Sequence, residues 1–80
     1  MTKDEIKKVI KTAICEIAPE YEEEDILENE NIQRSLEIDS FDFLNMLTGL
    51  NNTLGVAVPE SDYAKVDTVE HMTEYFSKHL

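Results

Sequence analysis

The sequence predicts an all-α protein, a small four-helix bundle with three longer helices and one short third helix. Apolar residues recur at three- and four-residue spacing in three separate stretches, which is the pattern of amphipathic helices. No stretch alternates polar and apolar residues long enough to indicate a sheet. Because a chain of 80 residues has the size of one small domain, we expect residues 1–80 to form a single domain.

The first helix is expected to begin just after Thr2. Thr2 and Glu5 have the spacing of a capping box, and Pro19 ends the helix because the residue before a proline is pushed out of helical geometry. Cys15 falls opposite the apolar stripe, so we expect it to be exposed and without the base that a catalytic cysteine needs. The stripe consists of Ile6, Val9, Ile10, Ala13, Ile14 and Ile17.

A long loop is expected from residue 19 to residue 38, between the first and second helices. Its apolar residues Leu27, Ile32, Leu36 and Ile38 should pin it to the helices, and residues 22–27 favour one short helical turn. Its acids lack the alternating ligands and central glycine of an EF-hand, so we expect no dedicated metal site.

The second helix should run from Ser40 to Leu54, with Asp39 and Ser40 at its start. Its core face consists of Phe43, Met46, Leu47, Leu50 and Leu54. Phe41 and Leu44 fall on a different side, next to Thr48, where they form either an exposed binding surface or ordinary core beneath the long loop. Gly49 inside the helix is expected to allow close approach by a neighbouring helix.

Gly55 is suited to a left-handed helix cap. After it, Val56 and Val58 should anchor the chain, and a short third helix is expected from Pro59 to Val66, with Tyr63 and Val66 facing inward.

The last helix is expected to begin at Asp67, with Glu70 completing a capping box. Its stripe consists of Val69, Met72, Thr73, Phe76 and Leu80, flanked by Tyr75. His71 and His79 should face solvent.

The net charge of −11 is concentrated in the middle of the chain. Residues 1–15 carry +2, residues 16–42 carry −10 and residues 43–80 carry −3. Nucleic acid is excluded as a partner, since binding it requires Lys and Arg to neutralise phosphates. A focused acidic surface instead favours partners with basic patches.

A single cysteine allows no intramolecular disulfide, which is typical of a reducing cytosol. No apolar run approaches the roughly 20 residues of a membrane span, and the first residues do not resemble a signal peptide. We therefore expect a cytoplasmic monomer.

The stretch around Asp39-Ser40-Phe41, preceded by Leu36 and followed by an apolar helix, resembles the attachment signature of acyl carrier proteins and peptidyl carrier domains. The resemblance extends over most of the chain, through a Val58-Pro59-Glu60 segment to the last helix. Two residues depart from the family pattern. Glu37 stands where the family usually has glycine, which puts the backbone geometry of the loop in question, and Phe41 stands where it usually has leucine.

The resemblance implies that Ser40 receives 4′-phosphopantetheine from coenzyme A through a phosphopantetheinyl transferase, with Asp39 helping to position the transferase or its metal. The arm would then hold acyl intermediates as thioesters. Phe41, Asp42, Leu44 and Thr48 would contact partner enzymes or the acyl chain. The partners would be acyl-loading and acyl-processing enzymes of fatty-acid, polyketide or related metabolism.

The helix after Ser40 lacks the further acids of typical fatty-acid carriers, because Asn45, Asn51 and Asn52 occupy the corresponding region. We therefore expect a specialised, free-standing carrier with its own loading and tailoring enzymes.

Other interpretations stay open. The chain could be an unmodified, carrier-like acidic docking protein, or a peptidyl carrier domain of a nonribosomal peptide pathway. From the residues alone, Asp39 or Ser40 could also be no more than a helix cap. A hydrolase that uses Ser40 is improbable because no base is placed beside it, so we expect that the protein is not an enzyme.

Overall fold

The computed structural model describes residues 1–80 and confirms the all-α prediction. The longer helices are α1 (Lys3–Ile17), α3 (Ser40–Leu54) and α4 (Val69–His79). Shorter elements are η1 (Glu23–Asp25), α2 (Ile32–Ser35) and η2 (Glu60–Val66), of which η1 and η2 are 3₁₀ helices. None of the helices has the length and apolar character needed to span a membrane.

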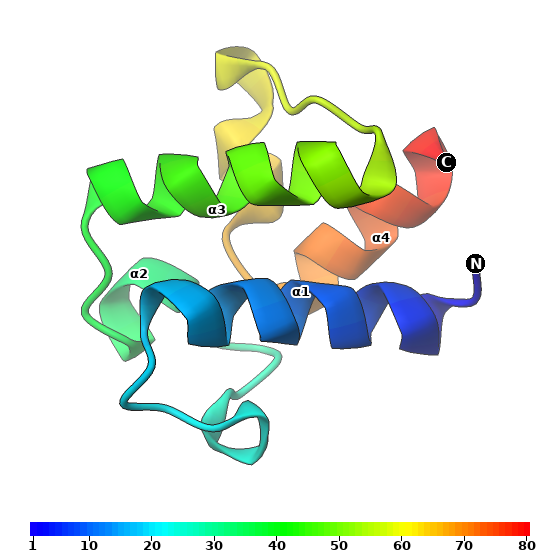
Figure 1. The fold of residues 1–80 in the computed structure, drawn as a ribbon. Coiled ribbons are helices and arrows are strands. Elements are labelled where there is room, and N and C mark those ends of the chain that lie inside the picture. The colour runs from blue at the N-terminus through cyan, green and yellow to red at the C-terminus, as the bar shows by residue number, and fades with distance from the viewer.

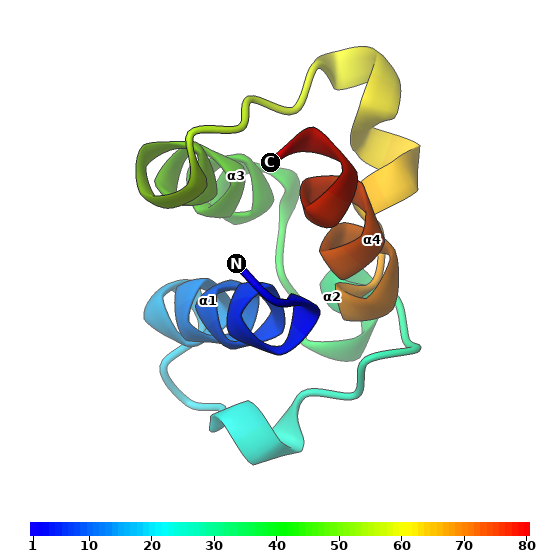
Figure 2. The same ribbon diagram turned by 90° about the vertical axis from the view of Figure 1, so that its right-hand side faces the viewer.

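The three longer helices surround one core (Figure 1). α1 and α3 lie side by side and run in opposite directions, while α4 crosses behind them. The view along α1 and α3 in Figure 2 shows η2 packed on the outer side of α4, away from α1. Nineteen buried apolar residues from all of these layers form the core.

α1 begins and ends as expected. The amide of Glu5 donates to Thr2 Oγ1 at 3.2 Å and the amide of Thr2 donates to Glu5 Oε1 at 2.9 Å, so the capping box is present. Ile6, Ile10 and Ile14 are buried in the core. Cys15 departs from the prediction, because it is half-buried and packs against the core. Its burial, together with nearby Glu23, raises the pKa of its thiol.

The long connection is pinned by the residues predicted, with one exception. Ile32, Leu36 and Ile38 are buried, but Leu27 is 53% exposed and Ile26 takes its place in the core. The prediction for Leu27 is wrong because the backbone at Ile26 is extended after the turn of η1, and neighbouring side chains of an extended chain point to opposite sides.

Glu28 ties this connection to two helices. Its carboxylate pairs with the ammonium groups of Lys7 and Lys11, each at 2.9 Å. Its backbone carbonyl accepts a hydrogen bond of 2.9 Å from the amide of Glu70, in the first turn of α4. Hydrogen bonds from the two lysines lower the pKa of Glu28, and the same contact raises the pKa of Lys7.

α2 is an element that the prediction missed, and it ends in a left-handed backbone at Glu37. Glu37 has φ of +54°, and the amide of Ile38 donates to the carbonyl of Gln33 at 3.0 Å. This is the Schellman arrangement that ends many helices, normally with glycine at the left-handed position. The glutamate therefore adopts the backbone geometry that glycine would adopt without strain.

α3 has the predicted bounds and the predicted buried face. Gly55 closes it with φ of +72°, as expected. The expectation for Gly49 is wrong, because a Cβ at this position would meet nothing within 4 Å. Gly49 therefore costs helix stability, up to ~1 kcal/mol relative to alanine, without allowing any close packing inside this chain.

Two predictions for α4 are wrong. Its cap is Thr68, whose Oγ1 accepts from the amide of His71 at 3.0 Å, because Thr68 is the residue with the extended backbone of a cap while Asp67 is helical. Asp67 instead contacts His71 Nδ1 at 2.6 Å and raises the pKa of His71. Leu80 is 54% exposed, since the helix ends at His79 before completing its stripe, and Tyr75 is buried in its place.

Tyr75 also joins α4 to the short third helix. Its hydroxyl donates to Asp62 Oδ2 at 2.7 Å, which lowers the pKa of Asp62 and raises that of Tyr75. Val66 is fully buried and Tyr63 is half-buried, so η2 faces inward as predicted. His79 is exposed, as expected, and stacks on the ring of Tyr75 with centroids 4.2 Å apart.

The Glu28 ion pairs should stabilise the fold only above acid pH. We expect Glu28→Gln to lower the free energy of unfolding by about 0.5–1 kcal/mol at pH 7, in the range of partly exposed ion pairs. Because the pKa of Glu28 lies below its ordinary value of 4.5 in the folded protein, this contribution is present above pH 4.5 and is lost as the pH falls through the folded-state pKa. Urea unfolding at pH 7 and pH 3 measures both differences.

Glu30→Gln is the matched control, because Glu30 is exposed, forms no ion pair and carries the same charge. A loss of stability for Glu28→Gln that is equal at the two pH values, or equal to that of the control, would contradict this account.

Glu37→Gly should stabilise the protein. A left-handed backbone costs an L-residue roughly 1–2 kcal/mol, while glycine costs about 0.5–1 kcal/mol through the greater freedom of the unfolded chain. We therefore expect a net gain of about 0.5–1 kcal/mol in thermal or urea unfolding. Glu37→Ala removes the same charge but keeps the Cβ, so it should show no comparable gain. Equal gains in the two variants would assign the effect to charge instead of backbone strain.

Candidate functional site: the serine at the start of α3

Ser40 is the first residue of α3, and it is exposed. The left-handed turn at Glu37 brings the chain out of α2, and buried Ile38 anchors it before α3 begins. No hydrogen bond to the protein engages the Ser40 hydroxyl. The hydroxyl is therefore open to a partner at the end of a rigid helix.

Asp39 caps α3 with its side chain. Its Oδ1 accepts from the amide of Asp42 at 2.8 Å, and its carbonyl accepts from the amide of Phe43 at 3.0 Å. The amides of Ser40 and Phe41, in the first turn, have no acceptor within the helix. Together with the positive end of the helix dipole, these amides favour an anionic group on the Ser40 oxygen.

No general base is hydrogen-bonded to the Ser40 hydroxyl. His71 is engaged by Asp67, and His79 Nδ1 lies 2.7 Å from the carbonyl oxygen of Tyr75, so neither histidine is hydrogen-bonded to Ser40. A serine without such a partner is a weak nucleophile. The arrangement suits a serine that another enzyme modifies.

The acids around Ser40 carry unneutralised charge. Glu37, Asp39 and Asp42 form no ion pair, whereas Glu23 and Glu28 of the long connection pair with lysines of α1. The acidic field therefore includes residues that hold the long connection to α1, namely Glu23 and Glu28, and unpaired residues beside the serine. No group of three or more acids, histidines or cysteines has the geometry of a metal site.

Two apolar side chains are exposed next to the serine. Phe41 is 72% exposed and Leu44 is 40% exposed, so the long connection does not cover them. Thr48 is also exposed, one turn beyond Leu44, and its hydroxyl donates to the carbonyl of Leu44 at 3.0 Å. Of the two interpretations of this side of α3, the buried one is wrong.

A shallow pocket of about 310 Å³ lies beside Leu44 and Thr48, between α3 and the segment leading into η2. Val58 and Tyr63 form its opposite wall. Phe41 does not line it, although it lies on the same side of α3 as Leu44, one turn earlier. Ala57 also lines the pocket and was missed by the sequence prediction. The apolar run Val56-Ala57-Val58 before Pro59 was the only available signal for this wall.

Comparisons with known proteins show the family of this chain. The family model described as the phosphopantetheine attachment site matches residues 8–76. An acyl carrier protein of Lactobacillus johnsonii is 33% identical over 79 residues, covering 99% of this chain and 98% of that protein. An acyl carrier protein of Lactobacillus acidophilus is 29% identical over 79 residues, with the same coverage. The chain therefore belongs to the acyl carrier protein family, whose members are defined by a phosphopantetheine attachment site.

Proposed function

We propose that Ser40 bears the 4′-phosphopantetheine arm and that the protein delivers acyl groups to partner enzymes. The main support is that the Ser40 hydroxyl is exposed and unbonded at the start of a helix, in a chain that matches the family over residues 8–76. A carrier protein of this family is not itself an enzyme.

The residues present fit the phosphate end of the arm. The unbonded amides of Ser40 and Phe41 and the helix dipole favour a phosphodiester on the serine oxygen. Asp39 keeps its carboxylate on the amide of Asp42, so it fixes the helix end from which the arm would extend. When attached, the arm supplies the thiol that holds acyl groups as thioesters. Cys15 is unsuited to this task because it is half-buried and its thiol pKa is raised.

The surroundings of Ser40 support recognition by enzymes with basic and apolar patches. Phe41 offers a large exposed ring, and Asp42 adds an unpaired carboxylate on the same helix end. Leu44 and Thr48 border the shallow pocket, which would receive the first part of an acyl chain. Tethering the chain beside these residues gives it a high effective concentration at each successive active site.

The exposed face of α3 beyond this region is polar but uncharged, with Asn45, Asn51 and Asn52 all exposed. This supports a specialised carrier in acyl metabolism over a general fatty-acid carrier, because charge guides encounter and register with basic partners. The enzymes that load and process its cargo would bind to the acids around Ser40.

Modification at Ser40 is tested by intact mass. Co-expression with a broad-specificity phosphopantetheinyl transferase should add the mass of one phosphopantetheine group, and Ser40→Ala should show no addition. A control carrier that is fully converted validates the reaction. Absence of any gain in this protein would refute the carrier mechanism and favour an unmodified acidic docking protein. A gain that persists in Ser40→Ala would place the arm elsewhere.

A separate variant distinguishes the two roles proposed for Asp39. Asparagine caps helices about as well as aspartate, so Asp39→Asn should leave the melting temperature nearly unchanged. We expect the initial rate of modification by the transferase to fall about tenfold, which corresponds to about 1.4 kcal/mol in the barrier. Glu60→Gln removes an equal charge from an exposed position on η2 and should retain the rate. A rate for Asp39→Asn within twofold of the wild type would limit Asp39 to capping.

A further inference from the structure

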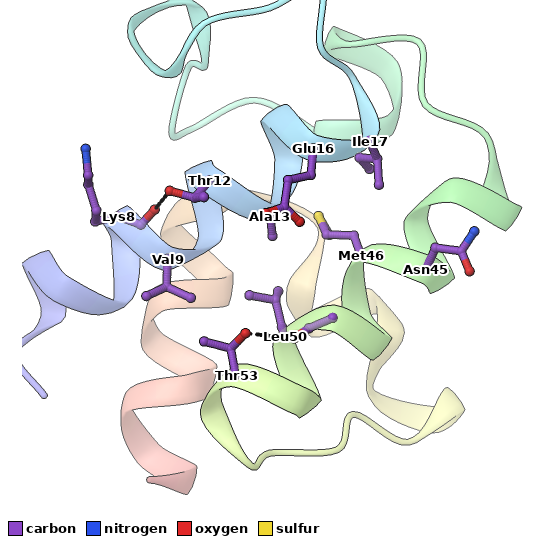
Figure 3. Close-up of a pocket in the computed structure, with 11 residues that line it drawn as sticks. Lys8, Val9, Thr12, Ala13, Glu16, Ile17, Asn45, Met46, Leu50 and Thr53 are labelled. Carbon is purple, nitrogen blue, oxygen red and sulfur yellow. Dashed lines mark hydrogen bonds between the residues drawn. The ribbon is translucent and has the colours of Figure 1, made fainter.

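A second hollow lies between α1 and α3, and the carrier function described above does not use it (Figure 3). It has a volume of about 230 Å³. Met46 and Leu50 from α3 and Val9 and Ala13 from α1 point into it, and Figure 3 shows these four side chains facing one another. We call this hollow the α1–α3 groove.

Gly49 lies in the α1–α3 groove, and nothing inside the chain explains it. A Cβ there would meet nothing within 4 Å, and glycine is a poor residue for a helix interior. Since no segment of this chain packs against it, the backbone of α3 is left open to close approach from outside.

The acyl chain is not the expected occupant of the groove. Ser40 and Gly49 are nine residues apart, which places them roughly 180° apart around the helix. The shallow pocket of Leu44 and Thr48 is on the side of Ser40 instead. The groove volume of about 230 Å³ is also below the roughly 300–1,000 Å³ of small-molecule sites, so it suits a few side chains of a protein partner.

Charge at the groove favours a basic partner. On the α1 side, Lys8 pairs with Glu23 at 3.0 Å, which cancels its charge, while exposed Glu16 has no ion pair. On the α3 side, Asn45 and Thr53 are exposed and uncharged. A second copy of this chain is disfavoured because two molecules of net charge −11 repel each other.

We propose that the α1–α3 groove binds an amphipathic basic helix of a partner protein. Aliphatic side chains of that helix pack on the half-buried Val9, Ala13 and Ile17 of α1 and on the open backbone of Gly49. A lysine or arginine at its edge pairs with Glu16. This helix-in-groove mode combines apolar anchors with a charged rim. It leaves Ser40 accessible, so a partner could hold the carrier by one side of α3 while the other side serves an active site.

The test is an NMR titration of the ¹⁵N-labelled, unmodified protein. The probe is a synthetic amphipathic helix of leucine and lysine, of roughly 18 residues so that it can form a helix, and the control probe has glutamate in place of lysine. We expect the lysine peptide to shift the amides of Ala13, Gly49 and Thr53 most strongly, with no binding of the glutamate peptide. Ser40→Ala should bind equally well, so this result does not depend on modification.

Variants locate the contact. Gly49→Gln should fill the groove and weaken binding at least tenfold, and Glu16→Gln should weaken it several-fold. Gly49→Gln should remain folded, since its side chain enters open space, and its melting temperature should rise because it replaces a helix glycine. Asn52→Leu is the control, as an exposed α3 residue that does not line the groove, and it should retain the affinity.

Three results would overturn the proposal. One is that the peptide shifts mainly the amide signals of Phe41 and Leu44, or of the acidic connection, and binds Gly49→Gln as tightly as the wild type. Another is a set of groove shifts that grow with protein concentration alone, which would assign the groove to a second copy. The last is a shift of the groove amides when the protein is loaded with an acyl chain and no peptide is present. This would assign the groove to the cargo.

Discussion

The left-handed backbone at Glu37 is the constraint on which the site depends. It ends α2 through the hydrogen bond from Ile38 to Gln33, and it lets Ile38 enter the core within one residue. Asp39 can then adopt the extended conformation of a cap, with φ of −79° and ψ of 172°. Ser40 therefore emerges at the first position of α3 with its hydroxyl exposed. The strained backbone at Glu37 therefore helps to position Ser40.

The acidic middle of the chain has a structural role as well as the proposed recognition role. Glu28 and Glu23 hold the long connection against the lysines of α1, and the backbone of Glu28 reaches α4. These contacts add to the apolar packing of Ile26, Ile32, Leu36 and Ile38, which also holds the connection. They also explain why the positive charge of α1 is not available to partners. What remains unpaired is the acid near Ser40 and along the outer side of the connection.

The bounds of α1 and α3 could be predicted from the sequence because their caps and periodicity agree. Thr2, Pro19 and Gly55 each act through local geometry that a few neighbouring residues determine. Where two residues of similar type compete, local rules were not enough: Leu27 and Ile26 are both apolar, and only the extended backbone after η1 decides which one faces the core. Similarly, Thr68 and not Asp67 caps α4, because the backbone of Asp67 is helical.

The site could be predicted in part. The positions of Asp39 and Ser40 at the start of α3 were predicted because a capping pattern and a family signature coincide. Phe41 and Leu44 were placed off the core face by periodicity, and both are exposed. The wall formed by Val58 and Tyr63 depends on how η2 packs across from α3, which is a tertiary contact without a local signature. Gly49 was assigned to close packing within the chain because periodicity shows which side a residue is on, but not whether anything lies there.

α3 combines packing in the core with the proposed site at Ser40, and its composition reflects both roles. It has capping interactions at both ends, from Asp39 and Gly55, and a buried side that includes Leu50. Its interior contains Gly49, so the helix depends on these caps and on core packing more than on intrinsic propensity. Because its caps and its buried side stabilise α3, the two outer sides of the helix are not needed for folding. One of them adjoins Ser40 and the other forms the α1–α3 groove, so two partners could contact α3 without competing for the same residues.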